Sequence, residues 1–367
     1  MISSDGYRQT PLRAEHERLG AAMTGFAGFW MPLRYSGETA EHKAVRQAAG
    51  LFDLSHMGEI VLRGPDVEAA LDYALIGELS TVKPGRARYT MICAEDGGVL
   101  DDLVVYRRSG QEYLVIANAS NTARVVSELT ARAGGYDCQV RDATDDYALI
   151  ALQGPAAAAI LAPLTGLDLD AIKYYAGAAG EVAGREAWVA RTGYTGEDGF
   201  EVYCAPADAP HVWDTMLERG APAGLVPAGL AARDTLRLEA GMPLYGNELG
   251  PDVTPFEANL GRLVKFGKPG DFVGRSALEE RAATGPRHVL TGLTIASRRV
   301  ARHGYPVLAD GRELPVGSVT SGAPSPTLGV PIAMAYVLPD MVATAVDIRG
   351  EAVPAIVTEL PFYRRRH

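Results

Sequence analysis

Short apolar runs that end at glycine and proline alternate with amphipathic stretches along most of the chain. A strand-like region at residues 52–63 leads to Gly64 and Pro65 and then a helix-like stretch, and residues 148–153 lead to a second Gly-Pro pair and an alanine-rich run. Proline is well suited to the first turn of a helix. The shared order of strand, Gly-Pro and helix predicts two related α+β layers, although the two segments form no detectable sequence repeat.

Two hairpins are also predicted. Residues 98–106 and 112–118 flank a turn that contains Gly110, and residues 187–191 and 200–203 flank a glycine-rich loop. Apolar runs joined by a short glycine-containing connection are typical of antiparallel strands. The N-terminal part indicates a helix, a loop and a second helix. Amphipathic stretches predict helices at residues 37–49, 121–133, 209–219 and 230–240.

From about residue 288 onward, short apolar strands are separated by glycine and proline turns. This pattern predicts a small antiparallel β-barrel of roughly 80 residues. The polar residues 279–287 would form the boundary before it. The expected strands are residues 289–295, 316–320, 332–337, 343–348 and 352–359.

The composition fits a packed protein of several domains. The chain has 367 residues, of which 47% are hydrophobic and 22% are charged. This length corresponds to two or three domains of about 100–150 residues. The net charge of −10 argues against a chain-wide nucleic-acid surface, which is usually basic. Arginine carries nearly all of the positive charge, and its planar guanidinium binds carboxylates well.

Cysteine and histidine form no metal or disulfide pattern. The cysteines are few, far apart and without a CxxC pair, and the histidines form no HxxxH motif. We therefore expect a reducing compartment and no zinc site. No apolar run approaches ~18 residues, and residues 1–10 lack the apolar region of a signal peptide. The sequence thus predicts a cytoplasmic protein that does not bind membranes.

The first hairpin contains an adjacent pair of carboxylates, Asp101 and Asp102. Aspartate is uncommon in strands, and adjacent strand residues point to opposite faces. At least one carboxylate therefore enters a largely apolar layer, which is costly unless it is paired or hydrogen-bonded. Two interpretations stay open: a solvated pair at the edge of a turn, or a carboxylate that belongs to a functional site.

Asn118 and Glu201 are further candidates. The hairpin places Asp102 opposite residues 116–118, so Asn118 would lie directly across or one diagonal away. A carboxylate and an amide on one face could bind a ring with N–H and C=O groups, whereas Asn118 could equally end a strand or cap a helix. Glu201 could accept hydrogen bonds from paired N–H donors. Its position in the predicted strand, taken alone, favours a solvent-facing residue.

Arg233 and Arg237 lie four residues apart and share one face of a predicted helix. They could bind a carboxylate, but surface pairing with Asp234 and Glu239 is favoured without further context. His56 is a lone histidine in an apolar setting, which is more typical of a structural residue than of a ligand.

Several stretches resemble, in order, motifs of the glycine cleavage T-protein family, whose members are tetrahydrofolate-dependent aminomethyltransferases. The resemblance covers almost the whole chain. Each stretch alone is weak evidence for the family, but together they are strong evidence. They lie at residues 10–12, 26–33, 51–57, 97–106, 152–155, 193–201, 229–241, 244–246, 320–329 and 361–364.

The resemblance implies an α+β fold of three lobes in a cloverleaf, with two α+β lobes and a C-terminal antiparallel β-barrel around a central folate channel. The folate-binding region would cover residues 8–275. Its two lobes would be interleaved, one at about residues 1–50 plus 145–275 and the other at about residues 51–144. The barrel domain would cover residues 285–367.

The family resemblance also implies a reaction in the breakdown of glycine. An aminomethyl group would arrive on the lipoyl arm of a carrier, the H-protein. The enzyme would pass the one-carbon unit to tetrahydrofolate as co-substrate, releasing ammonia and forming methylenetetrahydrofolate. No metal and no flavin would take part.

The resemblance assigns roles to individual positions. Asp102 matches the family's catalytic aspartate, and Glu201 would bind the amino and ring N–H groups of the pterin. Arg233 and Arg364 would meet the carboxylate end of folate or close the channel. The positions that match folate contacts in the family are Tyr89, Asn118, Tyr174, Glu201, Arg233, Tyr245 and Arg364.

Two alternative functions remain. Another folate-dependent one-carbon transferase on this fold, such as a demethylase, would share the folate site and differ in its second substrate. A non-catalytic folate-binding protein is the less favoured alternative, because such paralogues carry a Lys-Gly-Cys-Tyr motif and residues 191–197 contain no cysteine.

Overall fold

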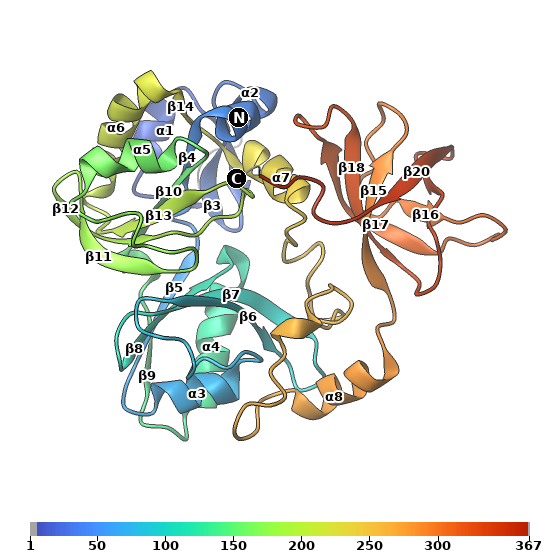
Figure 1. Cartoon of the computed structure of the whole chain (residues 1–367), viewed down its shortest axis with the longest axis horizontal. Helices are drawn as coiled ribbons and strands as arrows, with labels where there is room; N and C mark the ends of the chain where they lie inside the picture. The colour runs from blue at the N-terminus through green and yellow to red at the C-terminus, as the bar shows by residue number, and fades with distance from the viewer. Residues whose placement is uncertain (1–5, 366–367) are drawn as a thin grey trace. The chain divides into compact units, whose positions relative to one another are not determined.

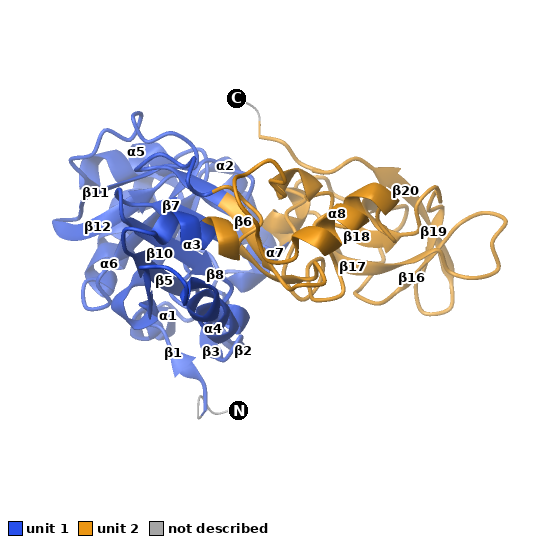
Figure 2. Ribbon diagram, turned by 90° about the horizontal axis from the view of Figure 1, so that it is seen from below, with its two compact units in different colours: residues 1–71, 79–88, 103–234 blue, residues 72–78, 89–102, 235–367 orange. Residues whose placement is uncertain are grey.

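The computed structural model describes residues 6–365, so the predicted features at both extreme ends lie partly outside the described residues. The chain forms a mixed α+β fold, as predicted. It divides into two compact units (Figure 2). Unit 1 comprises residues 1–71, 79–88 and 103–234, and unit 2 comprises residues 72–78, 89–102 and 235–367.

Unit 1 contains a six-stranded sheet with the order β11-β12-β13-β10-β4-β14 (Figure 1). Neighbouring strands are antiparallel except for β14, which pairs in parallel with β4. β10 is a continuous apolar strand because both of its faces are buried. The strands are β4 (Ala49–Asp53), β10 (Ala148–Gln153), β11 (Gly177–Val182), β12 (Arg185–Ala190), β13 (Gly199–Cys204) and β14 (Leu225–Pro227).

The helices of unit 1 pack against these strands. Trp213 and Met216 on α6 are fully buried and join the sheet residues Leu152, Val202 and Phe200 in one core. The helices with most residues in unit 1 are α1 (Arg13–Arg18), α2 (Glu38–Gln47), α3 (Val67–Ala74), α4 (Thr122–Ala133), α5 (Ala157–Leu161) and α6 (Ala209–Gly220). The predicted helices at residues 37–49, 121–133 and 209–219 are confirmed as α2, α4 and α6.

A second sheet has the strand order β6-β7-β8-β5-β9, and the division between the units crosses β6 and β7. The predicted hairpin is confirmed, because β7 pairs antiparallel with β8 and Val104 lies opposite Ile116. The second predicted hairpin is likewise confirmed as β12 and β13. The strands of this sheet are β5 (Gly58–Arg63), β6 (Ala87–Cys93), β7 (Val99–Arg107), β8 (Glu112–Ala117) and β9 (Gln139–Asp142).

Two N-terminal predictions were wrong. The region before residue 51 holds a small sheet in addition to its helices, formed by β1 (Arg8–Gln9), β2 (Ala22–Phe26) and β3 (Phe29–Arg34). Residues 52–63, predicted as one strand region, belong to β4 and β5 in different sheets. The turn around Ser55 separates them, and Asp53 Oδ1 accepts the Ser55 N–H at 2.9 Å there.

Unit 2 contains the predicted antiparallel barrel, closed in the order β15-β18-β17-β16-β19-β20 (Figure 1). Its core is formed by small and β-branched residues such as Val307, Ala333 and Val346. The three-residue strand β16 was not predicted. The strands are β15 (Val289–Ile295), β16 (Pro306–Leu308), β17 (Gly317–Pro324), β18 (Pro331–Val337), β19 (Ala345–Asp347) and β20 (Ala352–Thr358).

Two further helices connect to this barrel unit. α7 (Leu230–Glu239) confirms the prediction for residues 230–240, and α8 (Arg275–Thr284) precedes the barrel. Leu238 on α7 packs with the barrel residues Ile332 and Met334, which ties the end of the helix to the barrel within unit 2.

Candidate active site

Glu201 lies in the middle of β13 in unit 1 and holds its carboxylate within a cluster of hydroxyl groups. Thr192 Oγ1 donates a hydrogen bond to Glu201 Oε2 at 2.5 Å. Tyr106 and Tyr203 direct their hydroxyls to the same oxygen at 3.4 Å and 3.5 Å. No described residue donates a hydrogen bond to Oε1. Glu201 is thus fixed through one oxygen, while the other can accept N–H groups from a ligand.

Burial and the neighbouring groups act in opposite directions on the charge of Glu201. Burial raises the pKa of Glu201, and the Thr192 hydroxyl and Arg233 oppose that rise. Burial also raises the pKa of Tyr106 and Tyr203 well above the ordinary value, so both remain O–H donors. Arg233 stacks over Tyr194, with Cζ 4.7 Å from the ring centroid. The sequence alone favoured a solvent-facing Glu201, and this interpretation was wrong.

Gln153 holds the glycine-rich loop that carries Thr192. Its Nε2 donates to Thr192 O at 3.0 Å, and its Oε1 accepts from Thr195 Oγ1 at 2.9 Å. A Cβ atom at Gly193 would lie 1.9 Å from Gln153 Oε1, so a side chain there would displace Gln153 from these hydrogen bonds. Arg46 Nη1 donates to Thr195 O at 2.7 Å. Sequence reasoning missed Gln153, although a polar residue at the end of the apolar strand β10 was a usable signal.

Asp102 lies on β7 in unit 2, where Tyr89 donates its hydroxyl proton to Asp102 Oδ2 across 2.9 Å. The neighbouring Asp101 is fully buried, whereas Asp102 is half-buried. The alternation along β7 confirms that the two carboxylates point to opposite faces of the strand. A carboxylate that receives a phenol hydrogen bond and remains partly accessible can accept a proton or stabilise positive charge.

Two further predicted positions are Asn118 and Tyr174. Asn118 follows β8 with an extended backbone, and its carbonyl accepts the Asn121 N–H at 2.9 Å. Tyr174 is 50% exposed, and its ring meets that of Tyr175 edge-on with centroids 4.9 Å apart.

Tyr245 and Arg364, the other two predicted positions in unit 2, have different surroundings. Tyr245 forms an isolated β-bridge with Leu249 and packs against an apolar cluster of unit 2. Arg364 is an exposed side chain that pairs with Glu359 at 3.3 Å. These contacts leave the guanidinium of Arg364 accessible to an anion.

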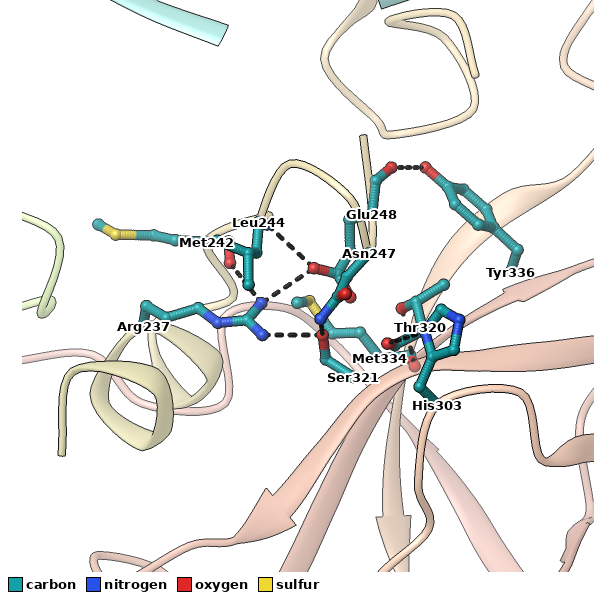
Figure 3. A network of polar contacts seen from close by, with 10 residues as sticks. All are labelled: Arg237, Met242, Leu244, Asn247, Glu248, His303, Thr320, Ser321, Met334 and Tyr336. Carbon is teal, nitrogen blue, oxygen red and sulfur yellow. Dashed lines mark hydrogen bonds and ion pairs between the residues drawn. The ribbon is translucent and has the colours of Figure 1, made fainter. Parts of the chain in front are cut away.

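Arg237 is not a surface residue, so the favoured interpretation of a surface pairing was wrong. Its guanidinium is buried within unit 2, where Nη1 donates to Glu248 Oε2 at 2.9 Å and Nη2 donates to Ser321 Oγ at 2.8 Å (Figure 3). Glu239 instead accepts hydrogen bonds from Ser325 and Thr327. Arg237 therefore has a structural role.

His56 lies in an apolar environment, as its sequence context indicated. Its ring is buried and contacts Phe26 and Phe29 edge-on. Burial lowers the pKa of His56 to about 4, so the imidazole is neutral near pH 7. Nowhere in residues 6–365 do three or more His, Cys, Asp or Glu side chains gather to hold a metal ion. None of the helices in this part of the chain has the length and hydropathy of a membrane-spanning helix.

Comparison with known proteins places these features in a family. The model of the GCVT N-terminal domain matches residues 12–268, and the model of the glycine cleavage T-protein C-terminal barrel domain matches residues 288–364. The aminomethyltransferase of Streptomyces avermitilis is 60% identical, and the alignment covers all of both chains. The aminomethyltransferase of Saccharopolyspora erythraea is 61% identical over 98% of each chain.

A solved structure agrees with the sequence comparisons. The crystal structure of glycine cleavage system aminomethyltransferase T from Bartonella henselae superposes with a TM-score of 0.91 and is 37% identical. The match covers 98% of this chain and 99% of that one. The similarity extends over both α+β sheets and the barrel. This chain therefore belongs to the glycine cleavage T-protein family of aminomethyltransferases.

Proposed function

We propose that this chain transfers the one-carbon unit of an aminomethyl group from the lipoyl arm of the H-protein to tetrahydrofolate. In this reaction the bonds from the carbon to nitrogen and to sulfur break, and two bonds to folate nitrogens form. The two protons lost by the folate N–H groups are recovered in ammonia and in the dihydrolipoyl thiol. The proposed reaction needs no metal and no flavin.

The observation that carries the proposal is the carboxylate of Glu201. Oε2 is occupied by the Thr192 hydroxyl, while Oε1 accepts no hydrogen bond from residues 6–365. The amino group and neighbouring ring N–H of a pterin form a pair of donors on one edge. A fixed carboxylate is a good acceptor for such a pair because hydrogen bonds to a charged group are stronger than neutral ones. Arg233 supports the negative charge of Glu201.

We assign the catalytic carboxylate to Asp102. As the carbon–nitrogen bond breaks, positive charge develops on the transferred carbon, and a nearby carboxylate lowers the energy of that charge. The hydrogen bond from Tyr89 orients Asp102. We further propose that Asn118, Tyr174, Tyr245 and Arg364 contact folate, with the arginines Arg233 and Arg364 serving its carboxylate end.

The test is an ammonia-release assay with aminomethylated lipoyl H-protein, with and without tetrahydrofolate, set against free dimethylglycine and related methyl donors. We expect rapid ammonia release only from the carrier substrate and in the presence of tetrahydrofolate. Turnover of a free methylated amine in place of the carrier would indicate a demethylase on the same fold and would overturn the proposal.

Calorimetric titration of the Glu201→Gln variant with tetrahydrofolate tests the binding assignment. The amide keeps the shape of the side chain but presents N–H where the site needs an acceptor. The mismatch should cost about 1–3 kcal/mol of binding free energy. Glu181→Gln, an exposed position on β11 of the same sheet, is the matched control and should bind as wild type does. Unchanged affinity in Glu201→Gln would remove Glu201 from the pterin site.

A further inference from the structure

Glu59 is a buried carboxyl group without a hydrogen-bond partner. It lies on β5, between β8 and β9, and its side chain is 0% exposed. Neither carboxyl oxygen has a partner among residues 6–365. Its backbone, in contrast, is bonded to the turn that follows β9, where the N–H donates to Thr144 Oγ1 at 3.3 Å and the carbonyl accepts the Ala143 N–H at 2.8 Å. Burying an ionised carboxylate without partners is very costly, so this environment favours the neutral acid.

The register of the sheet puts Glu59 on the face that carries the Glu201 cluster. Glu59 lies opposite Ile116 on β8, and Ile116 lies opposite Val104 on β7. Because side chains alternate along a strand, Tyr106 shares this face with Val104. Tyr106 is one of the hydroxyl donors to Glu201. The orphaned carboxyl therefore belongs to the same layer of side chains as the proposed pterin acceptor.

The charged and titratable groups near Glu59 come from three strands. Tyr106 on β7 shares its face, Glu201 and Tyr203 lie on β13, and Asp142 on β9 is paired with the adjacent Ile60. Burial, and then the charges of Asp142 and Glu201, raise the pKa of Glu59 well above its ordinary value. Glu201 differs from Glu59 because three hydroxyls and Arg233 favour its ionised form. Of two carboxyl groups that repel each other, the one without donors is expected to hold the proton.

We propose that Glu59 is a positioning residue for the Glu201 site, holding a proton so that Glu201 alone carries the negative charge that receives the N–H groups of the ligand. This inference rests on the proposed function only for the identity of that ligand. The neutral acid beside Glu201 makes the site sensitive to pH. When Glu59 ionises, two adjacent buried negative charges face the ligand. Its N–H donors must then compensate both charges, and binding weakens.

The sign of the effect on folding follows from the raised pKa. A glutamate in the unfolded chain releases its proton near pH ~4.3, whereas the folded state keeps the Glu59 proton to a higher pH. Between these two values the folded state binds one proton more than the unfolded state. Stability that Glu59 contributes at low pH is therefore lost as pH rises through this window. Glutamine at this position has the same shape and no proton to lose.

The first measurement is urea unfolding of the wild type and of Glu59→Gln between about pH 5 and pH 8 without folate. We expect the ratio of their unfolding equilibrium constants to change by up to about tenfold per pH unit until pH reaches the folded pKa of Glu59, with the wild type losing stability relative to the variant. Glu181→Gln should show no such divergence. Parallel pH profiles for wild type and Glu59→Gln would overturn the inference. If Glu59→Gln does not fold, the infrared C=O band of a protonated carboxyl group in the wild type at pH 7 gives the same answer, and its absence overturns the inference.

The second measurement tests the coupling to Glu201. The same comparison is made in a Glu201→Gln background, where the charge that opposes ionisation of Glu59 is gone. In this background the double variant Glu59→Gln/Glu201→Gln is compared with Glu201→Gln. The difference in their unfolding free energies should stop changing at a lower pH than the difference between Glu59→Gln and the wild type. The same pH in both backgrounds would show that Glu59 does not act through Glu201, and the positioning role would fail.

The third measurement is the dissociation constant for tetrahydrofolate as a function of pH. Wild-type affinity should fall at alkaline pH, while Glu59→Gln retains its affinity. Equal pH dependence in the two proteins would overturn the positioning role. Failure of the proposed function is distinguishable, because it appears as unchanged folate affinity in Glu201→Gln, whereas the first two measurements use no folate.

Discussion

Arg237 and Glu248 form an ion pair that is closed to solvent within unit 2. Arg237 Nη1 lies 2.9 Å from Glu248 Oε2, and the two side chains are 1% and 0% exposed. The same arginine donates to Ser321 Oγ on β17, and Tyr336 donates to the Glu248 carbonyl from β18 (Figure 3). The pair thereby fastens α7 and the following loop to the barrel.

Replacing Arg237 should therefore destabilise the protein strongly. Arg237→Met leaves Glu248 buried without its cation, and breaking such a pair costs about 3–5 kcal/mol. Arg299→Met is the matched control, because Arg299 and Glu351 form an exposed pair whose loss should cost less than about 1 kcal/mol. Urea unfolding monitored by circular dichroism measures both. Equal losses in the two variants would contradict a structural role for the buried pair.

The stability of unit 1 should depend on pH through Asp53. Burial acts to raise the pKa of Asp53, but hydrogen bonds from His16 at 2.8 Å, from Thr10 at 2.6 Å and from the Ser55 N–H outweigh it, so the pKa is lowered. A lowered carboxyl pKa gives stability that is present above the unfolded value of about 3.9 and lost as pH falls through the folded value.

Asp53→Asn tests this dependence. The variant loses hydrogen bonds to a charged group, which contribute about 1.5–3 kcal/mol each. The gap in unfolding free energy between wild type and variant should be largest near pH 7 and should shrink below about pH 4. Urea titrations at a series of pH values measure the gap. A gap that stays constant down to pH 3 would show that Asp53 is not the ionised partner.

Tyr89→Phe should slow turnover while leaving the fold intact. The change removes the hydroxyl that donates to Asp102 Oδ2 and keeps the ring. A hydrogen bond to a charged group contributes about 1.5–3 kcal/mol, so a fall of roughly tenfold or more in kcat is expected. Tyr113→Phe is the control, because the buried Tyr113 hydroxyl donates to the Leu79 carbonyl. The control should lower the melting temperature and spare kcat, and the opposite pattern would remove Tyr89 from the reaction.

Asp102→Asn and Asp101→Asn should separate catalysis from folding. Asp102→Asn loses the negative charge and the capacity to accept a proton, so we expect turnover to fall by about 10²–10⁴-fold with little change in stability. Asp101 is fully buried on the opposite face, so Asp101→Asn should lower stability and leave the turnover of folded protein much less affected. Ammonia release from aminomethylated carrier at saturating tetrahydrofolate measures turnover. If Asp101→Asn is the variant that abolishes turnover, the face assignment fails.

Local periodicity in the sequence predicted the elements that depend on local chemistry. The β7–β8 hairpin follows from alternating apolar residues on either side of a short turn, and α4 and α6 follow from amphipathic spacing. The barrel strands other than β16 were visible because glycine and proline separate them. β16 was missed because its three residues are too few to show a period. The small N-terminal sheet was missed for a similar reason, since β1 has only two residues.

Family motifs identified Asp102 and Glu201 as candidates, but their surroundings required the tertiary structure. Glu201 receives hydroxyls from Thr192 and Tyr106, and Tyr106 comes from a different sheet. The spacing of residues along the chain does not predict this contact between Tyr106 and Glu201. The same is true of Glu59, which resembles any glutamate in an alternating strand until the register of β5 places it in the layer of Tyr106.

The α+β class, the C-terminal barrel and the opposite faces of Asp101 and Asp102 could be predicted without a structure, because each depends on the local period of side chains along one strand or helix. The packed structure was needed to see that Arg237 is buried with Glu248, that Asp53 is held by His16 and Thr10, and that the Glu59 carboxyl accepts no hydrogen bond from residues 6–365. Burial and pairing depend on segments distant in the chain, and the cost of an unpaired buried charge appears only when those segments pack together.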